Sequence, residues 1–365
     1  MVLLMHPTNS CNFSCRYCYL SEGTKTALNF MTVDFAKNVL HQVKDYLFQN
    51  KQQRIEILWH GGEPLLWGIE NYEEILEFSK HEFCDFDYRT TMQTNLSLIN
   101  ERYIDLFLKY RVNLSFSIDG TKELHDDLRV TQNGEGTFDI IMNKVKLCRE
   151  KGLHLGCIVV ANRNHIGKIP ELYKFMCDNK IGFKFNSLFN AGEAKKGISE
   201  FGLTPSEYAE IYIELFDLWF DDEKNKLHMS SFVDIAAGLI SKKVTGCTLG
   251  QNCQEQFLAI SPQGDVVPCG RFCDEELIKY SYGNLNTESL ESILQKRKNT
   301  DAYNRHKYIE ASSCKKCKFF DICHGGCLHD GYINGGNFKT KTFLCESYKK
   351  ILTHISKKLK EAEML

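Results

Sequence analysis

Short apolar and β-branched runs alternate with longer amphipathic segments along the first half of the chain. The strand-like runs cover residues 2–6, 54–60, 88–93, 112–118, 154–160 and 182–188. Segments with apolar residues at helical spacing lie near 33–48, 70–82, 101–110, 137–151 and 168–179. Such alternation is typical of a parallel sheet with helical crossovers. Six units predict an α/β fold, a partial (β/α)6 TIM barrel rather than a closed eightfold one.

The pattern changes after the sixth predicted strand. The stretch NAGEAKKG at 190–197 is polar and contains glycine, which predicts a linker. Two helices are expected after it, near 204–222 and 230–242. From Thr245 the chain is rich in cysteine and has little apolar periodicity. A segment of this kind needs cross-links, such as bound metal, to hold its shape.

A lysine-rich helix is expected at 346–362, near the end of the chain. These patterns together predict three parts. They are a barrel with linker helices over 1–230, a stapled domain over 231–350 and a C-terminal helix over 351–365.

Four short motifs follow the first four predicted strands. They are CNFSCRYC (11–18), HGGEP (60–64), QTN (93–95) and SIDG (117–120). Sites in parallel sheets of this type gather at the carboxyl ends of the strands. We therefore expect all four motifs to lie on one rim of the barrel and to form the functional site there.

The composition is that of an ordinary soluble protein with an ample core, since 43% of the 365 residues are hydrophobic and 25% are charged. No apolar run reaches the ~18 residues that a membrane span needs. The N-terminus, MVLLMHPTNSC, lacks the basic head and cleavage site of a signal peptide. We expect a cytoplasmic protein. The net charge of −2 gives no electrostatic reason to expect nucleic acid or a membrane as partners.

The chain contains sixteen cysteines, which in a large chain in a reducing compartment indicate metal or cluster binding. Three lie at 11–18 and nine follow residue 246. Cys84, Cys148, Cys157 and Cys177 are scattered between them, and we expect these four to be buried as small hydrophobic residues.

The first group, Cys11, Cys15 and Cys18, has the spacing C-x3-C-x2-C. Thiolates are soft ligands that select zinc or iron–sulfur clusters. Three thiolates leave one iron of a four-iron cluster without a protein ligand, and such an open position is a place for chemistry. A zinc site that shares a distant fourth ligand is the alternative.

CNFSCRYCYL resembles the signature of the radical S-adenosylmethionine superfamily, C-x3-C-x-aromatic-C, with Tyr17 as the aromatic residue. In that family the amino and carboxylate groups of S-adenosylmethionine chelate the free iron, and electron transfer yields a 5′-deoxyadenosyl radical. The resemblance implies that Tyr17 and the glycine-rich stretch bind the cofactor. In that stretch, which ends at Pro64, Gly61 and Gly62 permit close backbone approach. Glu63 and nearby carbonyls are expected to accept from the ammonium group.

The same resemblance implies further contacts along the rim. Ser117 and Arg129 resemble the pair that contacts the ribose and the methionine carboxylate, which suits the guanidinium fork of arginine. A surface ion pair is the alternative for Arg129. Asn162 is a candidate for the nucleoside. Gln93 and Asn95 are placed to hold the substrate backbone, with an unspecific polar rim as the alternative.

The cysteine pattern after residue 246 resembles the SPASM extension of radical enzymes that modify peptides and proteins. QGDVVPCGRF reads as strand, turn and strand, GNL (283–285) precedes a helix, and KKCKFFDICHGGC follows. That extension holds two auxiliary four-iron clusters. The resemblance implies three [4Fe–4S] clusters and S-adenosylmethionine in all. The implied auxiliary ligands are Cys247, Cys253, Cys269 and Cys327 for one cluster, and Cys314, Cys317, Cys323 and Cys345 for the other. A pair of zinc ribbons is the alternative, and Cys273 could replace a neighbouring ligand.

Among well-known relatives of this layout, anaerobic sulfatase-maturating enzymes oxidise Cys or Ser to formylglycine. In that group an aspartate base follows the third ligand of the first auxiliary cluster, but Gly270 stands there in this chain. WHGGEPLL, PCGRF and the GGCLHDGY stretch look more like maturases of ribosomally made peptides. We therefore expect a radical oxidoreductase that crosslinks an aromatic carbon to a β-carbon in a precursor peptide, as in a cyclophane. A formylglycine-generating maturase, and a thioether-forming or epimerising maturase, are the alternatives.

A crosslinking or oxidising reaction also needs a base within hydrogen-bond reach of its proton. Asp274, His329 and Asp330 are candidates, whereas we interpret Asp119 as a turn residue. A non-catalytic iron–sulfur or zinc scaffold needs neither HGGEP nor an open cluster position, so both argue against it. A sugar-type small-molecule substrate is a further alternative.

The resemblance implies a precursor peptide or protein as substrate and an electron donor such as flavodoxin or ferredoxin. Only ten residues precede Cys11. We therefore expect the barrel, the linker helices or a separate protein to read the leader of the substrate.

Overall fold

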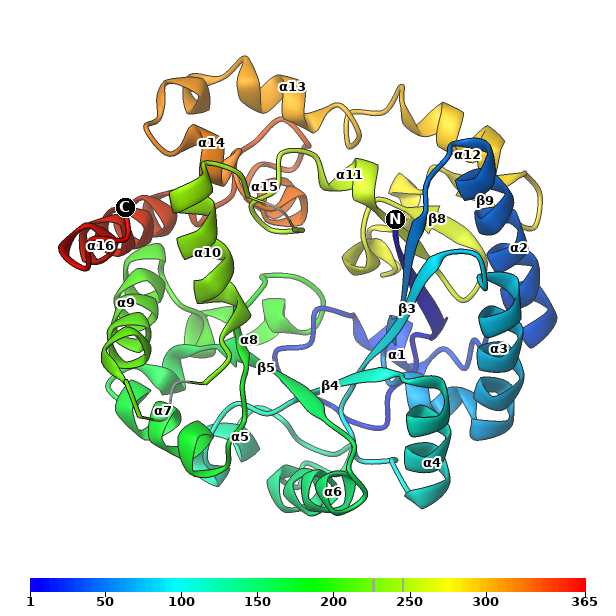
Figure 1. Cartoon of the computed structure of the whole chain (residues 1–365), viewed down its shortest axis with the longest axis horizontal. Coiled ribbons are helices and arrows are strands. Elements are labelled where there is room, and N and C mark those ends of the chain that lie inside the picture. Colours follow the sequence, from blue (N-terminus) through cyan, green and yellow to red (C-terminus); the bar gives the residue numbers. More distant parts are fainter. Residues whose placement is uncertain (225–226, 245) are drawn as a thin grey trace.

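One nine-stranded sheet organises the computed structural model, which describes residues 1–224, 227–244 and 246–365 (Figure 1). The strand order is β6-β5-β4-β3-β2-β1-β7-β8-β9. The first six strands are parallel to their neighbours. They are β1 (Val2–Thr8), β2 (Arg54–Gly61), β3 (Asp87–Thr94), β4 (Asn113–Ser117), β5 (Leu155–Ala161) and β6 (Lys184–Ser187). The six predicted strands and the partial barrel are thereby confirmed.

The crossover helices lie on the outer side of this curved sheet (Figure 1). They are α2 (Val33–Gln49), α3 (Ile69–Glu82), α4 (Glu101–Tyr110), α6 (Phe138–Glu150) and α7 (Ile169–Asp178). The hydroxyl of Thr32 caps α2 by accepting from the Phe35 N–H at 3.2 Å. Val39 and Val43 of α2 are buried in the same core as Leu3. The predicted crossovers are confirmed, and their outward positions leave the carboxyl edge of the strands free for a site.

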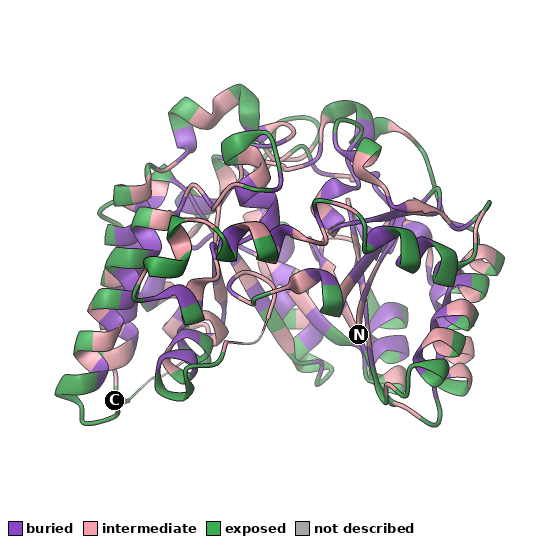
Figure 2. Cartoon of the chain, turned by 90° about the horizontal axis from the view of Figure 1, so that it is seen from above, coloured by how far each residue is buried: buried purple, intermediate pink, exposed green. Residues whose placement is uncertain are grey.

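Short helices fill the connections at that edge. They are α1 (Glu22–Thr26), η1 (Pro64–Trp67), α5 (Lys122–Asp126) and η2 (Arg163–His165). Buried residues line the strands and the inward helix faces, while exposed residues lie on the outer faces (Figure 2). No helix in the described ranges is long and apolar enough to cross a membrane.

Three further strands extend the sheet beyond β1. β7 (Phe257–Ile260) pairs parallel with β1, and β8 (Asp265–Val267) and β9 (Gly283–Asn284) follow antiparallel. The strand and turn expected near QGDVVPCGRF are therefore present. The sequence does not predict that these strands attach to β1. Their attachment covers the edge of β1, which a partial barrel would leave unpaired. The cysteine-dense segment is thus continuous with the barrel sheet.

The rest of that segment consists of short elements, in agreement with the loop-rich prediction. They are α11 (Cys253–Gln256), η3 (Gly270–Phe272), η4 (Ile278–Tyr280), α12 (Leu290–Arg297), α13 (Arg305–Glu310), η5 (Ser313–Lys316), α14 (Phe320–Cys323) and α15 (Leu328–Gly335). Thr245, where this segment is predicted to begin, lies outside the described residues.

The linker predicted at 190–197 is wrong from Ala194 onward, because α8 (Ala194–Phe201) begins there. Ala194 and Phe201 are buried in a small cluster with Tyr17 and Leu128. Burial against the barrel therefore stabilises a helix that the polar sequence and the internal glycine do not favour.

The helices expected after the linker are present as α9 (Pro205–Asp221) and α10 (Ser230–Ser241), and the final helix as α16 (Cys345–Glu361). α16 is held to α9 by a 2.6 Å hydrogen bond from the Ser347 hydroxyl to the Pro205 carbonyl. An ion pair of 3.0 Å between Lys358 and Asp221 adds to this contact. α16 also packs against α10, which in turn lies against β6, the strand at the edge of the sheet.

The four scattered cysteines fit their prediction only in part. Cys148 and Cys157 are buried, as expected, and Cys177 is half-buried. Cys84 is exposed, so the prediction is wrong there. It lies in the turn between α3 and β3, at the surface of the molecule.

Candidate active site

The end of β2 packs backbone against backbone on the start of the three-cysteine loop. A Cβ on Gly61 would lie 2.1 Å from the Thr8 carbonyl oxygen, and one on Gly62 would lie 2.2 Å from that of Asn9. The Gly62 N–H donates to the Thr8 carbonyl at 3.2 Å. Only glycine fits so close an approach. Two of the predicted motifs therefore meet on one rim.

Glu63 ties the ends of β2 and β3 together from inside the protein. Its buried carboxylate accepts hydrogen bonds from the Leu65 N–H at 3.0 Å, and from the Thr94 hydroxyl and the Asn95 N–H at 2.6 Å each. Burial raises the pKa of Glu63 to about 7 against the effect of these bonds. Pro64 begins η1, and its carbonyl accepts from the Tyr72 hydroxyl at 3.0 Å. A contact of Glu63 with the cofactor stays a prediction.

The polar residues after β3 support the cysteine loop directly. The Asn95 amide donates to the Asn12 side chain at 2.9 Å and lies 3.8 Å from the Cys11 sulfur. The Gln93 amide donates to the Ser117 hydroxyl of β4 at 3.0 Å. Asn95 therefore has a supporting role here, and the predicted substrate contacts of Gln93 and Asn95 stay predictions.

Asp119 is the centre of a buried polar network behind the cysteine loop. Its carboxylate accepts from the Tyr17 hydroxyl, from Arg129 Nε at 2.8 Å and from the Val160 N–H at 2.9 Å. The Arg129 guanidinium also lies 5.1 Å from the centre of the Tyr17 ring. Although burial opposes it, Arg129 holds the pKa of Asp119 below its ordinary value. The interpretation of Asp119 as a turn residue stays a prediction, and a surface ion pair for Arg129 is ruled out because the pair is buried.

Asn162 is fully buried at the start of η2. Its side chain accepts from the Asn164 N–H and donates to the Val160 carbonyl, both at 3.0 Å. These bonds give Asn162 a capping role, so its contact with a nucleoside stays a prediction.

The three-cysteine loop fits a cluster by its donor chemistry. Burial raises the pKa of all three thiols, that of Cys18 to about 11, and neighbouring thiols add to the effect for Cys11 and Cys18. The Phe13 N–H points at the Cys11 sulfur at 3.4 Å. Donors aimed at sulfur stabilise thiolate ligands, and metal binding displaces the thiol protons. Cys11, Cys15 and Cys18 would hold the first cluster.

The predicted ligands of the first auxiliary cluster lie together between the sheet and α15. Burial raises the pKa of Cys253, and the neighbouring Cys247, Cys327 and Cys269 raise it further. Arg271 Nη1 donates to the Cys327 sulfur at 3.4 Å. These four residues would hold this cluster. Cys273 is buried beside Cys269, and its carbonyl accepts from the Asn9 amide at 2.8 Å.

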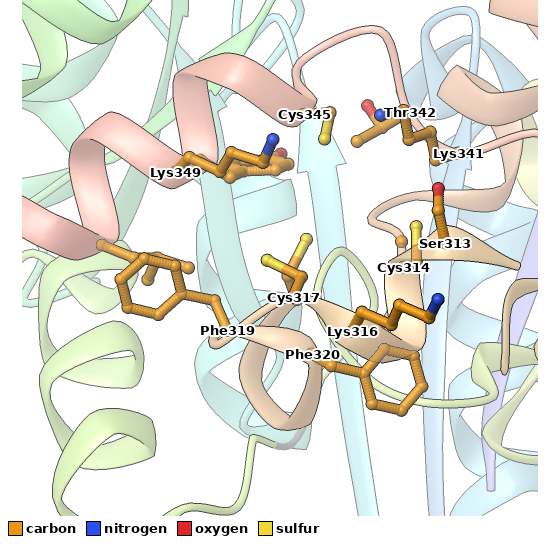
Figure 3. A pocket seen from close by; sticks show the side chains of 14 residues that line it. Ser313, Cys314, Lys316, Cys317, Phe319, Phe320, Lys341, Thr342, Cys345 and Lys349 are labelled. Atoms are coloured by element: carbon orange, nitrogen blue, oxygen red, sulfur yellow. The ribbon is translucent and has the colours of Figure 1, made fainter.

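The predicted ligands of the second auxiliary cluster line a cavity of about 300 Å³. Figure 3 shows the sulfurs of Cys314, Cys317 and Cys345 directed toward a common space, and Cys323 also lines it. In the described ranges, no three His, Cys, Asp or Glu side chains are placed to hold a single metal ion. Four thiols around such a volume suit a [4Fe–4S] cluster, which binds one cysteine at each iron.

The three predicted bases are all buried in this structure. The Asp274 carboxylate accepts from the Ser21 N–H at 2.7 Å and from the Thr24 hydroxyl at 3.1 Å, and so holds α1. His329 packs edge-to-face on Phe272 at 5.6 Å, and Asp330 lies 3.5 Å from Arg271. His329 and Asp330 thus stand beside the first auxiliary ligands, and their role as a base stays a prediction.

Sequence reasoning missed two histidines of the site, His6 on β1 and His60 on β2. Their rings stack with centroids 5.5 Å apart. Tyr19 meets His60 edge-on at 6.4 Å. One feature of the sequence could have identified them. Each histidine stands at the end of an apolar strand, next to a motif of the rim.

Two family models match the chain in the order that the structure shows. The model of the radical SAM superfamily matches residues 5–176, and the SPASM model, an iron–sulfur cluster-binding domain, matches residues 247–318. The chain therefore carries a radical S-adenosylmethionine domain followed by a SPASM domain. It is an enzyme whose cofactors are S-adenosylmethionine, the [4Fe–4S] cluster of the barrel and auxiliary clusters of the SPASM domain.

Curated relatives match nearly the whole chain. The cysteine-type anaerobic sulfatase-maturating enzyme of Clostridium novyi is 27% identical over 98% of this chain and 97% of its own length. The serine-type anaerobic sulfatase-maturating enzyme of Bacteroides thetaiotaomicron is 23% identical over 95% of this chain and 87% of its own.

Solved structures share the fold. "Native anSMEcpe with bound AdoMet and Cp18Cys peptide" superposes with a TM-score of 0.85 at 22% identity, covering 99% of this chain and 98% of the other. SuiB of Streptococcus suis bound to its precursor peptide SuiA gives 0.64 at 19% identity, covering 94% and 75%. Both likenesses show that the fold of this chain is shared with these two proteins over most of its length.

Proposed function

We propose that this enzyme oxidises a Cys or Ser side chain of a peptide or protein substrate to the aldehyde of formylglycine. The observation that carries the proposal is the full-length similarity to cysteine-type and serine-type sulfatase-maturating enzymes. The cysteines agree with it, because the chain brings together one three-cysteine loop and two four-cysteine groups, each of which could hold an iron–sulfur cluster. This was the alternative in the sequence prediction, and the comparisons favour it over the cyclophane crosslink.

Each residue of the site then has a proposed part. When bound, the cofactor and clusters supply hydrogen-atom abstraction and accept an electron. The barrel over 1–230 binds the cofactor, and the segment over 231–350 holds the auxiliary clusters. The proposed cofactor contacts are Tyr17, Gly61, Gly62, Glu63, Pro64, Ser117, Arg129 and Asn162. Gln93 and Asn95 would position the substrate backbone, and a flavodoxin or ferredoxin would supply electrons.

One observation keeps the crosslinking reaction as a second candidate. Gly270, directly after Cys269, offers no side chain where a base is expected in sulfatase maturation. Asp274, His329 and Asp330 would then be candidate bases for loss of the ring proton. Crosslinking and aldehyde formation leave different products, so one experiment separates them.

The test is anaerobic incubation of the cluster-loaded enzyme with S-adenosylmethionine, a reductant and short peptides. One peptide carries Cys in a C-x-P-x-R sequence, a second carries Ser at that position and a third carries Ala. We expect aldehyde in the first or second peptide, detected by mass spectrometry and hydrazine capture, and none in the third. Loss of two hydrogens with fragmentation suppressed between two residues would instead support the crosslink.

A further inference from the structure

The two histidines at the ends of β1 and β2 have no part in the roles above. On β1, Leu3 and Met5 are buried in the core shared with α2. Side chains alternate along a strand, so Leu4 and His6 face the opposite side, the interior of the barrel. A Cβ built on Gly270 meets both of these residues, which places the turn after Cys269 over them.

Hydrogen bonds define which nitrogen of His6 carries the proton. The Asn9 amide nitrogen donates to the Cys273 carbonyl at 2.8 Å, which fixes the orientation of the amide. The Asn9 oxygen then faces His6 Nδ1 at 2.9 Å. An oxygen can only accept, so Nδ1 carries the hydrogen and Nε2 presents its lone pair.

Nε2 of His6 is fully buried and has no hydrogen-bond partner within the described residues. A buried acceptor without a partner is costly, so Nε2 is free to accept a hydrogen bond or a proton from a group that comes within reach. Burial, with a smaller effect of His60, lowers the pKa of His6 to about 3, so the ring is neutral. His60 differs, because its Nδ1 accepts from the Gly61 N–H at 2.8 Å. Its hydrogen is therefore on Nε2.

Residue 270 has no side chain, and His6 occupies the space that a side chain there would need. A Cβ on Gly270 would lie 2.8 Å from His6 Nε2, closer than a carbon can approach without displacing the ring. His6 and a larger residue at 270 therefore exclude one another. Because Gly270 carries only hydrogens, no side chain of residue 270 covers Nε2.

We propose that His6, through Nε2, accepts the proton that leaves the substrate side chain during oxidation. This inference rests on the proposed function. For a Cys substrate, the CH2–SH group loses one hydrogen atom from carbon to the cofactor-derived radical. It then loses the S–H proton to Nε2 and one electron to an iron–sulfur cluster as oxidant. The C=S bond forms as the C–H and S–H bonds break, and water converts C=S to the aldehyde with release of hydrogen sulfide.

The first test replaces His6 by Gln, which keeps much of the volume and removes the basic lone pair. The readout is the ratio of aldehyde product to 5′-deoxyadenosine. Loss of a general base costs roughly 100-fold, so we expect product to fall by about that factor while 5′-deoxyadenosine still forms. His41→Gln on the exposed face of α2 is the matched control and should leave the ratio unchanged.

A second test changes residue 270 alone and then together with His6. Gly270→Asp alone should lower the unfolding temperature of the cluster-loaded enzyme, because the new side chain meets His6. The double variant His6→Ala with Gly270→Asp should recover the unfolding temperature and restore product above the level of His6→Ala. The unfolding temperature reports the steric match independently of activity.

The outcomes separate the two claims. Wild-type enzyme that oxidises a Cys or Ser peptide, with equal product per 5′-deoxyadenosine from His6→Gln, overturns the role of His6 and leaves the proposed function intact. A parallel fall of product and 5′-deoxyadenosine in His6→Gln also overturns it, since that pattern indicates a structural role. If the wild-type enzyme forms no aldehyde on either peptide, the proposed function fails and the inference fails with it.

Discussion

At the scale of single residues, the site depends on ionisable groups that are buried and held by hydrogen bonds or ion pairs. Glu63 and the Asp119–Arg129 pair are the main examples. Such groups are stable only while their partners stay in place. Each therefore gives a measurable effect when one partner is removed or titrated.

Glu63 should make stability depend on pH. Its pKa is raised from 4.5 to about 7 in the folded protein, so protonation favours the folded state. Its contribution is fully present below about pH 4.5 and is lost as the pH rises through about 7. The pKa difference corresponds to about 3 kcal/mol.

Chemical denaturation of wild-type enzyme and Glu63→Gln across this pH range measures the effect. We expect the free energy of unfolding of the wild type to fall relative to the variant as pH rises. Parallel curves for the two proteins would contradict the assignment.

Arg129→Met should strongly destabilise the protein. The substitution leaves the Asp119 carboxylate buried without its cation, which typically costs about 3–5 kcal/mol. Arg102→Met, at the exposed pair with Glu70, is the control and should cost less than about 1 kcal/mol. Comparable losses of unfolding free energy in the two variants would show that the Arg129 pair contributes no more than a surface pair.

The sequence predicts the cysteine groups and the rim motifs well, because their spacing carries the chemistry. It does not predict the role of Glu63 as a tie between β2 and β3, since that depends on how the strands align. His6 is missed for a related reason. A single histidine at the end of an apolar strand resembles a core residue until Gly270, 264 positions later, is found beside it.

At the scale of elements, the close contact between the β2 end and the cysteine loop is the feature most sensitive to change. Gly62→Ala would place a methyl group 2.2 Å from the Asn9 carbonyl oxygen and 2.3 Å from that of Ser10. We expect the loop to be displaced, with loss of the iron bound by Cys11, Cys15 and Cys18 and of cofactor cleavage. Gly156→Ala is the control.

The control should retain both properties, because a Cβ there would meet its nearest neighbour, the Ser115 hydroxyl, at 3.5 Å. Iron analysis and 5′-deoxyadenosine formation provide the comparison. Full iron content and cleavage in Gly62→Ala would show that the backbone contact is dispensable.

The six barrel strands and their crossovers are predictable because each repeats a local alternation of apolar and polar residues. The helix α8 and the pairing of β7 with β1 are not. α8 is stabilised by burying Ala194 and Phe201 beneath the cysteine loop, and β7 joins a strand more than 250 residues earlier. Both depend on contacts distant in sequence, which a local pattern does not contain.

At the scale of the whole molecule, the proposed function requires three clusters in one chain. The cluster-loaded enzyme should bind about twelve irons, four for each cluster. The double variant Cys314→Ala with Cys317→Ala should lose about four irons and keep cleavage of the cofactor, because the barrel cluster is separate. Zinc in place of iron at this site, found by elemental analysis, would support the zinc-ribbon alternative.

The most direct test of the central claim is the mass of a Cys-containing peptide after anaerobic turnover with S-adenosylmethionine and reductant. We expect CH2–SH to become CHO at one residue, with loss of sulfur and capture of the product by hydrazine. A peptide that keeps its sulfur and loses two hydrogens through a bond between two side chains would contradict it, and so would an unchanged peptide alongside ample 5′-deoxyadenosine.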